Sequence, residues 1–256
     1  MPRFKLTVAY DGTGLVGWQR QASGPSVQSL LEDALTILDD APVSVTGAGR
    51  TDAGVHALGQ VASATLARQI DAATLVRAIN AHLPDEVRVL DARETAPTFH
   101  PQFQATSKTY RYRLWTAAVV DPFEYRYVWH VPPPALDLSA MHAAAAMLEG
   151  RHDFAAFQTT GGAPGPTERH VFSARLTERP ADDPQPGLLV FDIRGDGFLR
   201  HMVRAIVGTL VEVGRGRRDA AWMRELLASR SRAQAGPTAP PAGLFLVRVD
   251  YDGGDL

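Results

Sequence analysis

The chain has 256 residues, 45% of them hydrophobic and 21% charged, a balance that excludes an extended disordered or collagen-like protein and suits one large or two small domains. It contains no cysteine, which excludes disulfides, cysteine-ligated metal centres and a thiolate nucleophile, and favours a reducing cytoplasm as its location. With 26 basic and 28 acidic residues the net charge is −2, so overall charge gives no indication of a nucleic-acid partner.

The first hundred residues predict alternating strands and helices. Ser26 and Asp71 are favourable N-caps, and each precedes a stripe of apolar residues at helical spacing. Apolar alternation marks the strands. The elements expected are strand 4–10, a helix from 27 to about 38, strand 43–45, strand 60–65, a helix from 72 to about 83, and strand 87–90. This β-α-β-β-α-β order is the ferredoxin-like arrangement.

The rest of the chain predicts a second α+β unit after a linker near residues 96–105. The elements expected there are strands 109–115 and 127–131, helix 138–148, strands 171–176 and 188–193, helices 199–213 and 220–227, and strand 245–249. We therefore predict an α+β fold class with two halves, residues 1–104 and residues 105–256. No apolar run reaches the roughly 20 residues that a membrane span needs, so no membrane partner is expected.

Several common cofactor motifs do not occur in the sequence. The glycine-rich segment 47–54 is similar to a phosphate-binding loop, but no Lys-Ser/Thr pair follows it and its glycines do not form G-x-G-x-x-G. There is no H-E-x-x-H, and the eight histidines are scattered singly. The motifs therefore predict neither a nucleotide cofactor nor a metal.

One carboxylate, Asp52, stands at the tip between two expected strands, next to Arg50, Thr51 and Gly54. One interpretation is a turn aspartate whose side chain accepts backbone N–H bonds. The other is a carboxylate held at the edge of a cleft, acting as nucleophile or base with a cation beside it.

Two further segments carry candidate functional residues. Arg204 lies at the margin of the apolar face of helix 199–213, where it is either a side chain that extends to solvent or a half-buried guanidinium that needs a carboxylate. In strand 109–115, Tyr110 and Tyr112 alternate with arginines. That pattern is typical either of RNA contact, with stacking on bases, or of a buried aromatic face.

Taken together, these segments resemble the A-type tRNA pseudouridine synthases, which act on the anticodon stem-loop. The resemblance covers almost the whole chain, and its most specific part is Gly-Arg-Thr-Asp-Ala-Gly-Val-His at 49–56. The other matching segments are Tyr-Asp-Gly-Thr at 10–13, Gly-Trp-Gln-Arg-Gln at 17–21, residues 108–112, residues 197–208, Gly-Pro-Thr-Ala-Pro at 236–240 and Gly-Leu-Phe-Leu-Val at 243–247.

The resemblance implies a role for four residues. Asp52 matches the family's catalytic aspartate, Arg204 the basic residue that pairs with it, Tyr110 the tyrosine that stacks on the target uracil, and Arg50 an arginine implicated in RNA binding and base flipping. It also implies a cofactor-free homodimer that binds tRNA and modifies uridines 38 to 40. The implied fold has two ferredoxin-like halves that form a mixed, mostly antiparallel sheet with a central active-site cleft.

The sequence departs from the family pattern at two positions. Leu15 stands where an aromatic residue is usual, and Gln102 stands where an arginine is frequent, which places one phosphate contact in doubt. A non-catalytic RNA-binding module remains as an alternative, because residues 194–232 hold nine arginines against four acidic residues. Binding alone, however, would not need an aspartate on a glycine-shaped turn.

Overall fold

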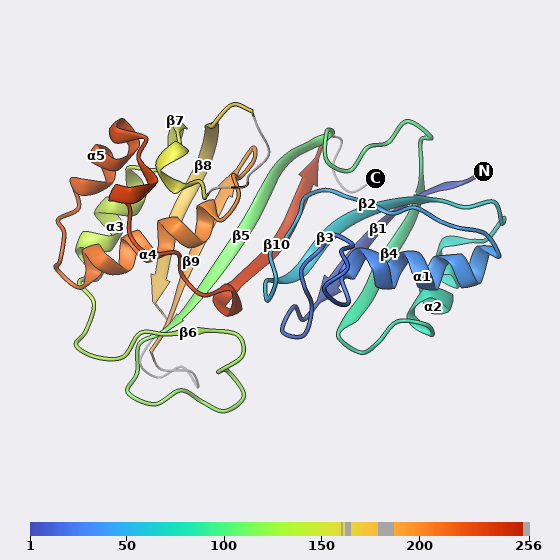
Figure 1. Ribbon diagram of the computed structural model, residues 1–256, viewed down its shortest axis with the longest axis horizontal. Helices are drawn as coiled ribbons and strands as arrows, with labels where there is room; N and C mark the ends of the chain where they lie inside the picture. Colours follow the sequence, from blue (N-terminus) through green and yellow to red (C-terminus); the bar gives the residue numbers. More distant parts are fainter. Residues whose placement is uncertain (160, 162–164, 179–186, 253–256) are drawn as a thin grey trace. The chain divides into compact units, whose positions relative to one another are not determined.

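A computed structural model describes residues 1–159, 161, 165–178 and 187–252. In this part of the chain ten strands, in mixed but mostly antiparallel pairing, combine with five α-helices (Figure 1). This confirms the predicted α+β class. The chain forms two compact units, Met1–Thr106 with Phe245–Leu256, and Ser107–Leu244. Within the described residues no helix is both long and apolar enough to cross a membrane.

The first unit is a sheet with the strand order β4-β1-β3-β10, and the short strand β2 pairs with β3. Its elements are β1 (Arg3–Tyr10), α1 (Val27–Asp39), β2 (Thr46–Gly47), β3 (His56–Thr65), α2 (Ala72–Asn80), β4 (Val87–Thr95) and β10 (Leu244–Tyr251). The strand β1 lies antiparallel to both β3 and β4. Its alternate side chains Phe4, Leu6, Val8 and Tyr10 are buried, so the predicted alternation and the β-α-β-β-α-β order are confirmed.

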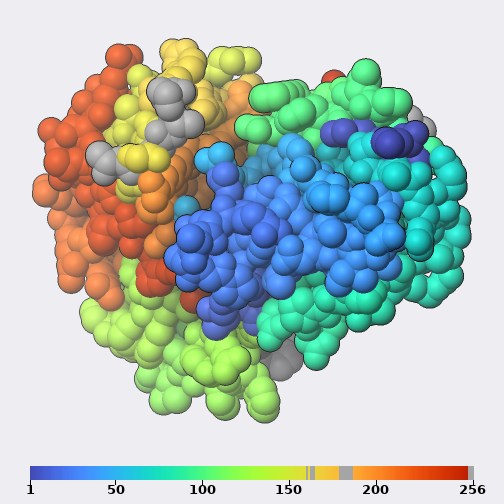
Figure 2. Space-filling view, turned by 45° about the vertical axis from the view of Figure 1, so that its right-hand side comes forward, coloured from blue at the N-terminus to red at the C-terminus, as the bar shows by residue number. Residues whose placement is uncertain are grey.

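Both helices of the first unit begin where the sequence predicted. Ser26 caps α1 in a capping box with Ser29, and its side chain accepts the Ser29 N–H at 3.1 Å. Asp71 caps α2 by accepting the Thr74 N–H at 2.9 Å. In the space-filling view of Figure 2, α1 and the sequence next to it form the blue surface of this unit.

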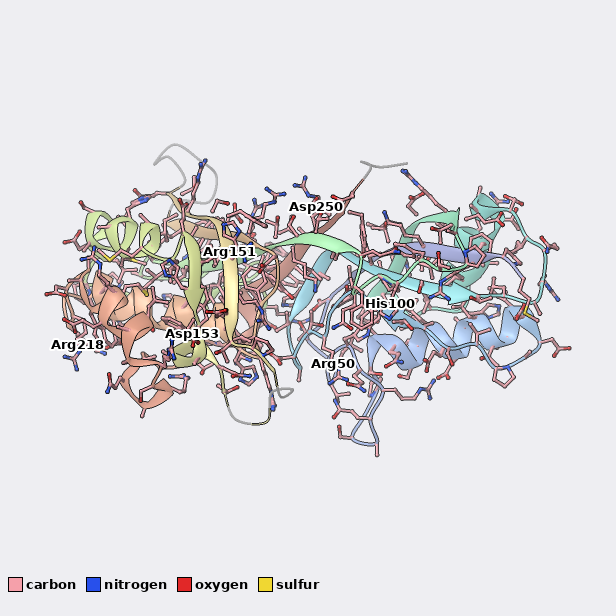
Figure 3. The ribbon with its side chains drawn as sticks, turned by 90° about the horizontal axis from the view of Figure 1, so that it is seen from above. Arg50, His100, Arg151, Asp153, Arg218 and Asp250 are labelled. Carbon is pink, nitrogen blue, oxygen red and sulfur yellow. The ribbon has the colours of Figure 1, made fainter. Side chains whose placement is uncertain are left out.

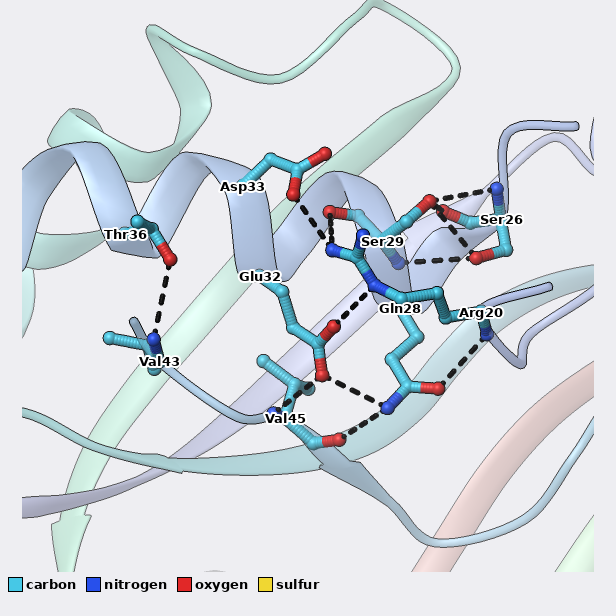
Figure 4. A network of polar contacts seen from close by, with 9 residues as sticks. All are labelled: Arg20, Ser26, Gln28, Ser29, Glu32, Asp33, Thr36, Val43 and Val45. Carbon is cyan, nitrogen blue, oxygen red and sulfur yellow. Dashed lines mark hydrogen bonds and ion pairs between the residues drawn. The ribbon is translucent and has the colours of Figure 1, made fainter. Parts of the chain in front are cut away.

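The predicted strand at 43–45 is wrong, since the strand begins only at Thr46. Side chains of α1 bind the backbone that would otherwise enter a ladder (Figure 4). Glu32 Oε1 accepts the Val45 N–H at 3.1 Å, and Gln28 Nε2 donates to the Val45 carbonyl at 3.1 Å. Because these groups are already paired, the segment needs no partner strand.

The second unit has the strand order β5-β9-β8-β7, and the short strand β6 pairs with β5. Its elements are β5 (Ala105–Trp115), β6 (Trp129–His130), α3 (Leu138–Ala146), β7 (Gly150–Asp153), β8 (Glu168–Glu178), β9 (Leu188–Gly195), α4 (Met202–Gly214) and α5 (Trp222–Ser229). Short 3₁₀ turns lie at Ala155–Phe157, Arg232–Gln234 and Pro241–Gly243. The helix α3 packs against α4 and β8. The sequence did not predict β7.

The helix α4 is buried along most of its length. It begins at Met202 instead of the expected residue 199, because His201 has a φ of 61°. A residue in the left-handed region cannot continue a right-handed helix, so residues 199–201 stay outside the helix.

The last strand, β10, belongs with the first unit. It pairs in parallel with β3, with Phe245 opposite His56 and Leu246 opposite Ala57. The observed units therefore differ from the expected halves 1–104 and 105–256, because residues 245–252 lie with the first unit. Sequence order alone does not show this, because the strand returns after the whole second unit.

Candidate active site

Asp52 lies on a tight loop between β2 and β3, in the first unit. The loop closes with a hydrogen bond from the Val55 N–H to the Asp52 carbonyl at 3.1 Å. Gly54 follows with a φ of 76°, a conformation that glycine adopts at little cost. Arg50, labelled in Figure 3, is exposed on the same loop, whereas Thr51 is buried and Asp52 is partly buried. Thr51 therefore lies inside the first unit, and the Asp52 carboxylate lies near its surface.

A buried polar cluster holds this loop from beneath. The Tyr10 hydroxyl and Thr51 Oγ1 are 2.8 Å apart, and Gln60 Nε2 donates to the Gly49 carbonyl at 2.9 Å. Gln60 also reaches the Tyr10 hydroxyl at 3.5 Å. Burial raises the pKa of Tyr10 to about 12, and the hydrogen bonds to Thr51 and Gln60 oppose this rise. Tyr10 therefore stays neutral, and side chains on β1 and β3 fix the backbone on the N-terminal side of Asp52.

The segment 17–18 contacts the loop from outside. The Trp18 N–H donates to the Thr51 carbonyl at 3.0 Å. Gly17 has a φ of 105°, and a Cβ there would lie 2.6 Å from the same carbonyl oxygen. The Trp18 ring packs so closely on Gly47 that a Cβ at Gly47 would lie 2.4 Å from it. Positions 17 and 47 thus require glycine, because neighbouring atoms leave no room for a Cβ. This close packing explains why the segment Gly-Trp-Gln-Arg-Gln at 17–21 occurs together with the aspartate loop.

Arg20 ties the same segment to α1 (Figure 4). Its Nε donates to Glu32 at 2.8 Å and one of its terminal nitrogens to Asp33 at 2.7 Å. Its backbone N–H donates to the Gln28 side chain at 3.0 Å. Exposed ion pairs of this kind stabilise weakly one by one, but here they fix the direction in which the segment leaves the loop.

The C-terminal side of the loop is held by Gly12 and His56. The Gly12 N–H donates to His56 Nδ1 at 3.1 Å, and Asp11 Oδ1 lies 3.1 Å from the same nitrogen. The first contact requires Nδ1 without a proton, whereas the second is an ion pair only when the proton is there. A Cβ at Gly12 would lie 2.2 Å from the Val55 carbonyl oxygen. The turn 10–13 therefore contacts the loop directly.

Tyr110 lies on β5 in the second unit, opposite Ile193 of β9. It is only 8% exposed, and its ring meets Phe198 edge to face with the centroids 5.1 Å apart. Tyr112 and Leu114 on the same face are buried as well, so this face of the strand packs into the second unit, and the stacking role of Tyr110 stays a prediction. Two residues before Tyr110, burial and the nearby Arg169 lower the pKa of Lys108.

Arg204 lies in the first turn of α4, also in the second unit. Its Nε donates to the Ala239 carbonyl at 2.7 Å, and the Ala239 N–H donates to the Arg204 carbonyl at 3.1 Å. The next carbonyl, that of Pro240, accepts the Tyr112 hydroxyl at 2.7 Å. The segment 236–240 thus links Arg204 to the strand that carries Tyr110, two residues from Tyr112.

Close packing sets the distance between α4 and this segment. A Cβ at Gly208 would lie 1.7 Å from the Pro237 carbonyl oxygen, and one at Gly236 would lie 2.7 Å from the Thr209 Cα. The buried Thr209 hydroxyl donates to the Ala205 carbonyl at 2.8 Å and accepts the Gly236 N–H at 3.0 Å. The segments 197–208 and 236–240, which both belong to the family resemblance, therefore pack against each other.

The four expected site residues form two pairs. Arg50 and Asp52 share a loop of the first unit, and Tyr110 and Arg204 lie on linked elements of the second. The pairing of Asp52 with Arg204 therefore stays a prediction. Sequence reasoning did not single out Gln60, although a long polar side chain among the small and apolar residues of β3 is a usable signal. Among the described residues no cluster of three or more histidine or acidic side chains is placed to hold a metal.

Comparison with known proteins gives consistent results. The profile of the family described as tRNA pseudouridine synthase matches residues 6–104 and 144–252. The chain is 47% identical over 254 residues to the tRNA pseudouridine synthase A of Myxococcus xanthus, covering 99% of this chain and 94% of that protein. It is 45% identical to the protein of the same name from Methylacidiphilum infernorum (97% and 95% covered). Identity is also 45% to that of Moorella thermoacetica (98% and 100% covered).

Proposed function

Because the chain belongs to the tRNA pseudouridine synthase family, we propose that it converts uridine to pseudouridine at positions 38, 39 and 40 of the tRNA anticodon stem-loop. Similarity over nearly the full length of both chains supports this assignment. The single observation that carries it is the loop of Asp52, which buried side chains of β1 and β3 hold on its N-terminal side and which Gly12 and His56 hold on its C-terminal side. An RNA-binding module would need no carboxylate held in this way.

The reaction rearranges bonds within one nucleotide. The bond between C1′ and N1 breaks, the uracil turns, and a new bond joins C1′ to C5, while C5 loses a proton and N1 gains one. Substrate and product are isomers, so the balance needs no oxidant, reductant or energy source. The residues of the chain must therefore hold the base, stabilise charge and move protons.

We assign the chemistry to Asp52. Breaking the glycosidic bond develops positive charge on the ribose, and an ionised carboxylate can respond in three ways: it can stabilise the charge, attack C1′, or remove the C2′ proton. Each requires the carboxylate to be ionised and directed at the sugar. The fixed backbone on both sides of Asp52 supports the second requirement.

Arg204 is assigned the role of keeping Asp52 ionised. An opposite charge within a few ångströms lowers the pKa of a carboxyl group. The Nε bond to Ala239 supports this role, since it fixes the direction of the guanidinium. A double-mutant cycle with Asp52→Asn and Arg204→Gln tests it: coupling in the single-turnover rate is expected, and additive effects would refute the pairing.

Tyr110 and Arg50 are assigned to substrate binding. Extrusion of a base from the stack costs a few kcal/mol, and stacking on an aromatic ring returns roughly 1–3 kcal/mol. The Tyr110 ring is already fixed by Phe198, so little freedom is lost on binding. Arg50 is exposed on the aspartate loop, where a guanidinium can contact phosphate or occupy the space that the base leaves.

The proposal extends to the setting of the enzyme. We propose a homodimer in the cytoplasm that needs no cofactor; the family resemblance supports the dimer, and the cysteine-free composition agrees with a reducing compartment. Sedimentation of the purified chain tests the dimer.

The test of function uses unmodified tRNA labelled with tritium at C5 of uridine. We expect the wild-type chain to release tritium and to form pseudouridine at positions 38 to 40, as read by sequencing. Asp52→Asn should lower the rate by at least about 10³-fold, the upper range for losing one charge-stabilising group, and keep tRNA affinity within about threefold. Binding without release by the wild type would favour the RNA-binding module, and normal turnover by Asp52→Asn would remove Asp52 from the chemistry.

A further inference from the structure

The segment between β4 and β5 carries an aromatic pair that the proposed reaction does not use. Phe103 is 78% exposed, and its ring stacks on that of His100 with the centroids 4.1 Å apart and the planes 24° from parallel. We propose that the face of Phe103 is a stacking site for an unpaired nucleobase of the tRNA, outside the position that receives the target uracil. This inference rests on the proposed function, because it takes RNA as the substrate.

Hydrogen bonds within the turn fix the pair before any ligand binds. His100 Nδ1 accepts the N–H groups of Gln102 at 3.2 Å and Phe103 at 3.3 Å. The Gln104 N–H donates to the His100 carbonyl at 3.2 Å, and the His100 N–H donates to Gln104 Oε1 at 3.3 Å. Both bonds end on the same ring nitrogen, so they hold the plane of the His100 ring in place.

The turn is also anchored to the first unit. The Tyr251 hydroxyl donates to the Pro101 carbonyl at 2.7 Å, and the rings of Tyr251 and the buried Phe99 lie 5.4 Å apart. Lys5 Nζ lies 4.5 Å above the Tyr251 ring. The turn is therefore held by β1 and β10, and a ring held this firmly loses little conformational entropy when a ligand stacks on it.

The surroundings of Phe103 favour a base over a second protein chain. Its sequence neighbours Gln102 and Gln104 are exposed amides, so polar groups flank the ring on both sides along the chain. A stable contact between two copies buries about 800 Å² on each partner. A single ring beside amides, which can bind the edges of bases, fits one nucleobase. Figure 2 shows the green segment that contains the turn at the surface of the first unit, and Figure 3 labels His100.

The experiment measures the dissociation constant of unmodified substrate tRNA for full-length variants over a series of salt concentrations. Phe103→Ala should weaken binding about 5- to 150-fold, which is the roughly 1–3 kcal/mol of one stacked base at about 1.4 kcal/mol per tenfold change. The slope of log K against log salt should stay the same, because no phosphate contact is lost. Phe103→Trp should restore the wild-type affinity.

Phe123→Ala is the matched control, since Phe123 is 86% exposed in the second unit; its affinity should equal that of the wild type. Equal affinity of Phe103→Ala and wild type would overturn the inference. So would a change in sedimenting mass with Phe103→Ala, because the ring would then be a contact between copies. Pseudouridine formation by the wild type, measured in parallel, reports on the proposed function separately, so the failure of one can be told from that of the other.

Discussion

At the scale of the residue, the main feature is how Asp52 is held. Its backbone neighbours are bound by residues far away in sequence: Tyr10 contacts Thr51 across 41 positions, and Gln60 contacts Tyr10 across 50. The loop therefore takes its shape from the finished sheet. A reactive carboxylate on an isolated peptide of the same sequence would have no such support.

This arrangement predicts the effect of Tyr10→Phe. The change removes the hydroxyl that is bonded to Thr51 and leaves a buried Thr51 oxygen without that partner, at a cost of about 1–3 kcal/mol in unfolding free energy. We expect a single-turnover rate about tenfold lower, because Asp52 loses its alignment, and an unchanged tRNA affinity. Urea unfolding and rapid-quench kinetics measure the two effects.

The control for Tyr10→Phe is Thr116→Val, which removes the hydroxyl bond to the Gly187 carbonyl in the second unit. It should lower stability to a similar extent with no loss of rate. If both variants lost the same rate, the effect of Tyr10 would be general destabilisation and not alignment of the loop.

The sequence could predict Asp52 and its turn because glycines and a strand pattern flank it. Its support could not be predicted from the residues in the same way. Tyr10 satisfies strand alternation whether or not its hydroxyl has a partner, and Gln60 gives no sign of which carbonyl it binds. Contacts between distant positions carry no local pattern, so the placing of Asp52 opposite Arg204 stays a prediction.

At the scale of the element, tight packing of α4 on Pro237 outweighs the low helix propensity of Gly208. Alanine is favoured over glycine in a helix by about 1 kcal/mol, so Gly208→Ala would stabilise an isolated helix. In the folded unit the added Cβ would lie 1.7 Å from the Pro237 carbonyl oxygen. The backbone of Pro237 cannot move aside as the end of a flexible side chain could. We therefore expect Gly208→Ala to lower the unfolding free energy by about 1–3 kcal/mol.

Gly14→Ala is the control for Gly208→Ala, since a Cβ at Gly14 meets nothing within 4 Å; its stability should stay within about 0.5 kcal/mol of the wild type. Activity of Gly208→Ala should fall as well, because Pro237 moves with the segment that holds Arg204. Thermal and urea unfolding measure the first effect. A more stable Gly208→Ala would show that the contact is looser than the structure has it.

Sequence patterns predicted most elements and failed at their ends for identifiable reasons. The strand expected at 43–45 is replaced by bonds from Glu32 and Gln28, which no strand pattern reveals. The helix expected from 199 begins at Met202 because His201 is left-handed. The four-residue strand β7 is too short to show alternation.

At the scale of the whole molecule, stability should depend on pH through buried tyrosines. Burial raises the pKa of Tyr10 to about 12 and also raises the pKa values of Tyr112 and Tyr251. In the unfolded chain these side chains lose their protons near pH 10, while the folded chain keeps them. Above pH 10 the unfolded state therefore binds fewer protons, and stability falls as pH rises, by about 1.4 kcal/mol per pH unit for each tyrosine.

Lys108 acts in the opposite direction, because its lowered pKa makes the folded chain release a proton before the unfolded one does. The contribution of Lys108 to the unfolding free energy rises with pH only below about pH 10.5. The loss of stability caused by the tyrosines is therefore clearest above that pH. Urea unfolding between about pH 10.5 and 11.5 should give a slope near −4 kcal/mol per pH unit. Tyr10→Phe should reduce the slope by about a third, and an unchanged slope would show that Tyr10 ionises normally.

The parallel pairing of β10 with β3 has a consequence for how the protein is made. A ribosome produces residues 244–251 only after the whole second unit, yet these residues supply the strand beside His56, directly after the aspartate loop. A nascent chain therefore carries an unfinished first unit during most of its synthesis. A premature stop codon directly before this strand should yield a polypeptide in which the second unit is nearly complete and the sheet of the first unit lacks its strand next to β3.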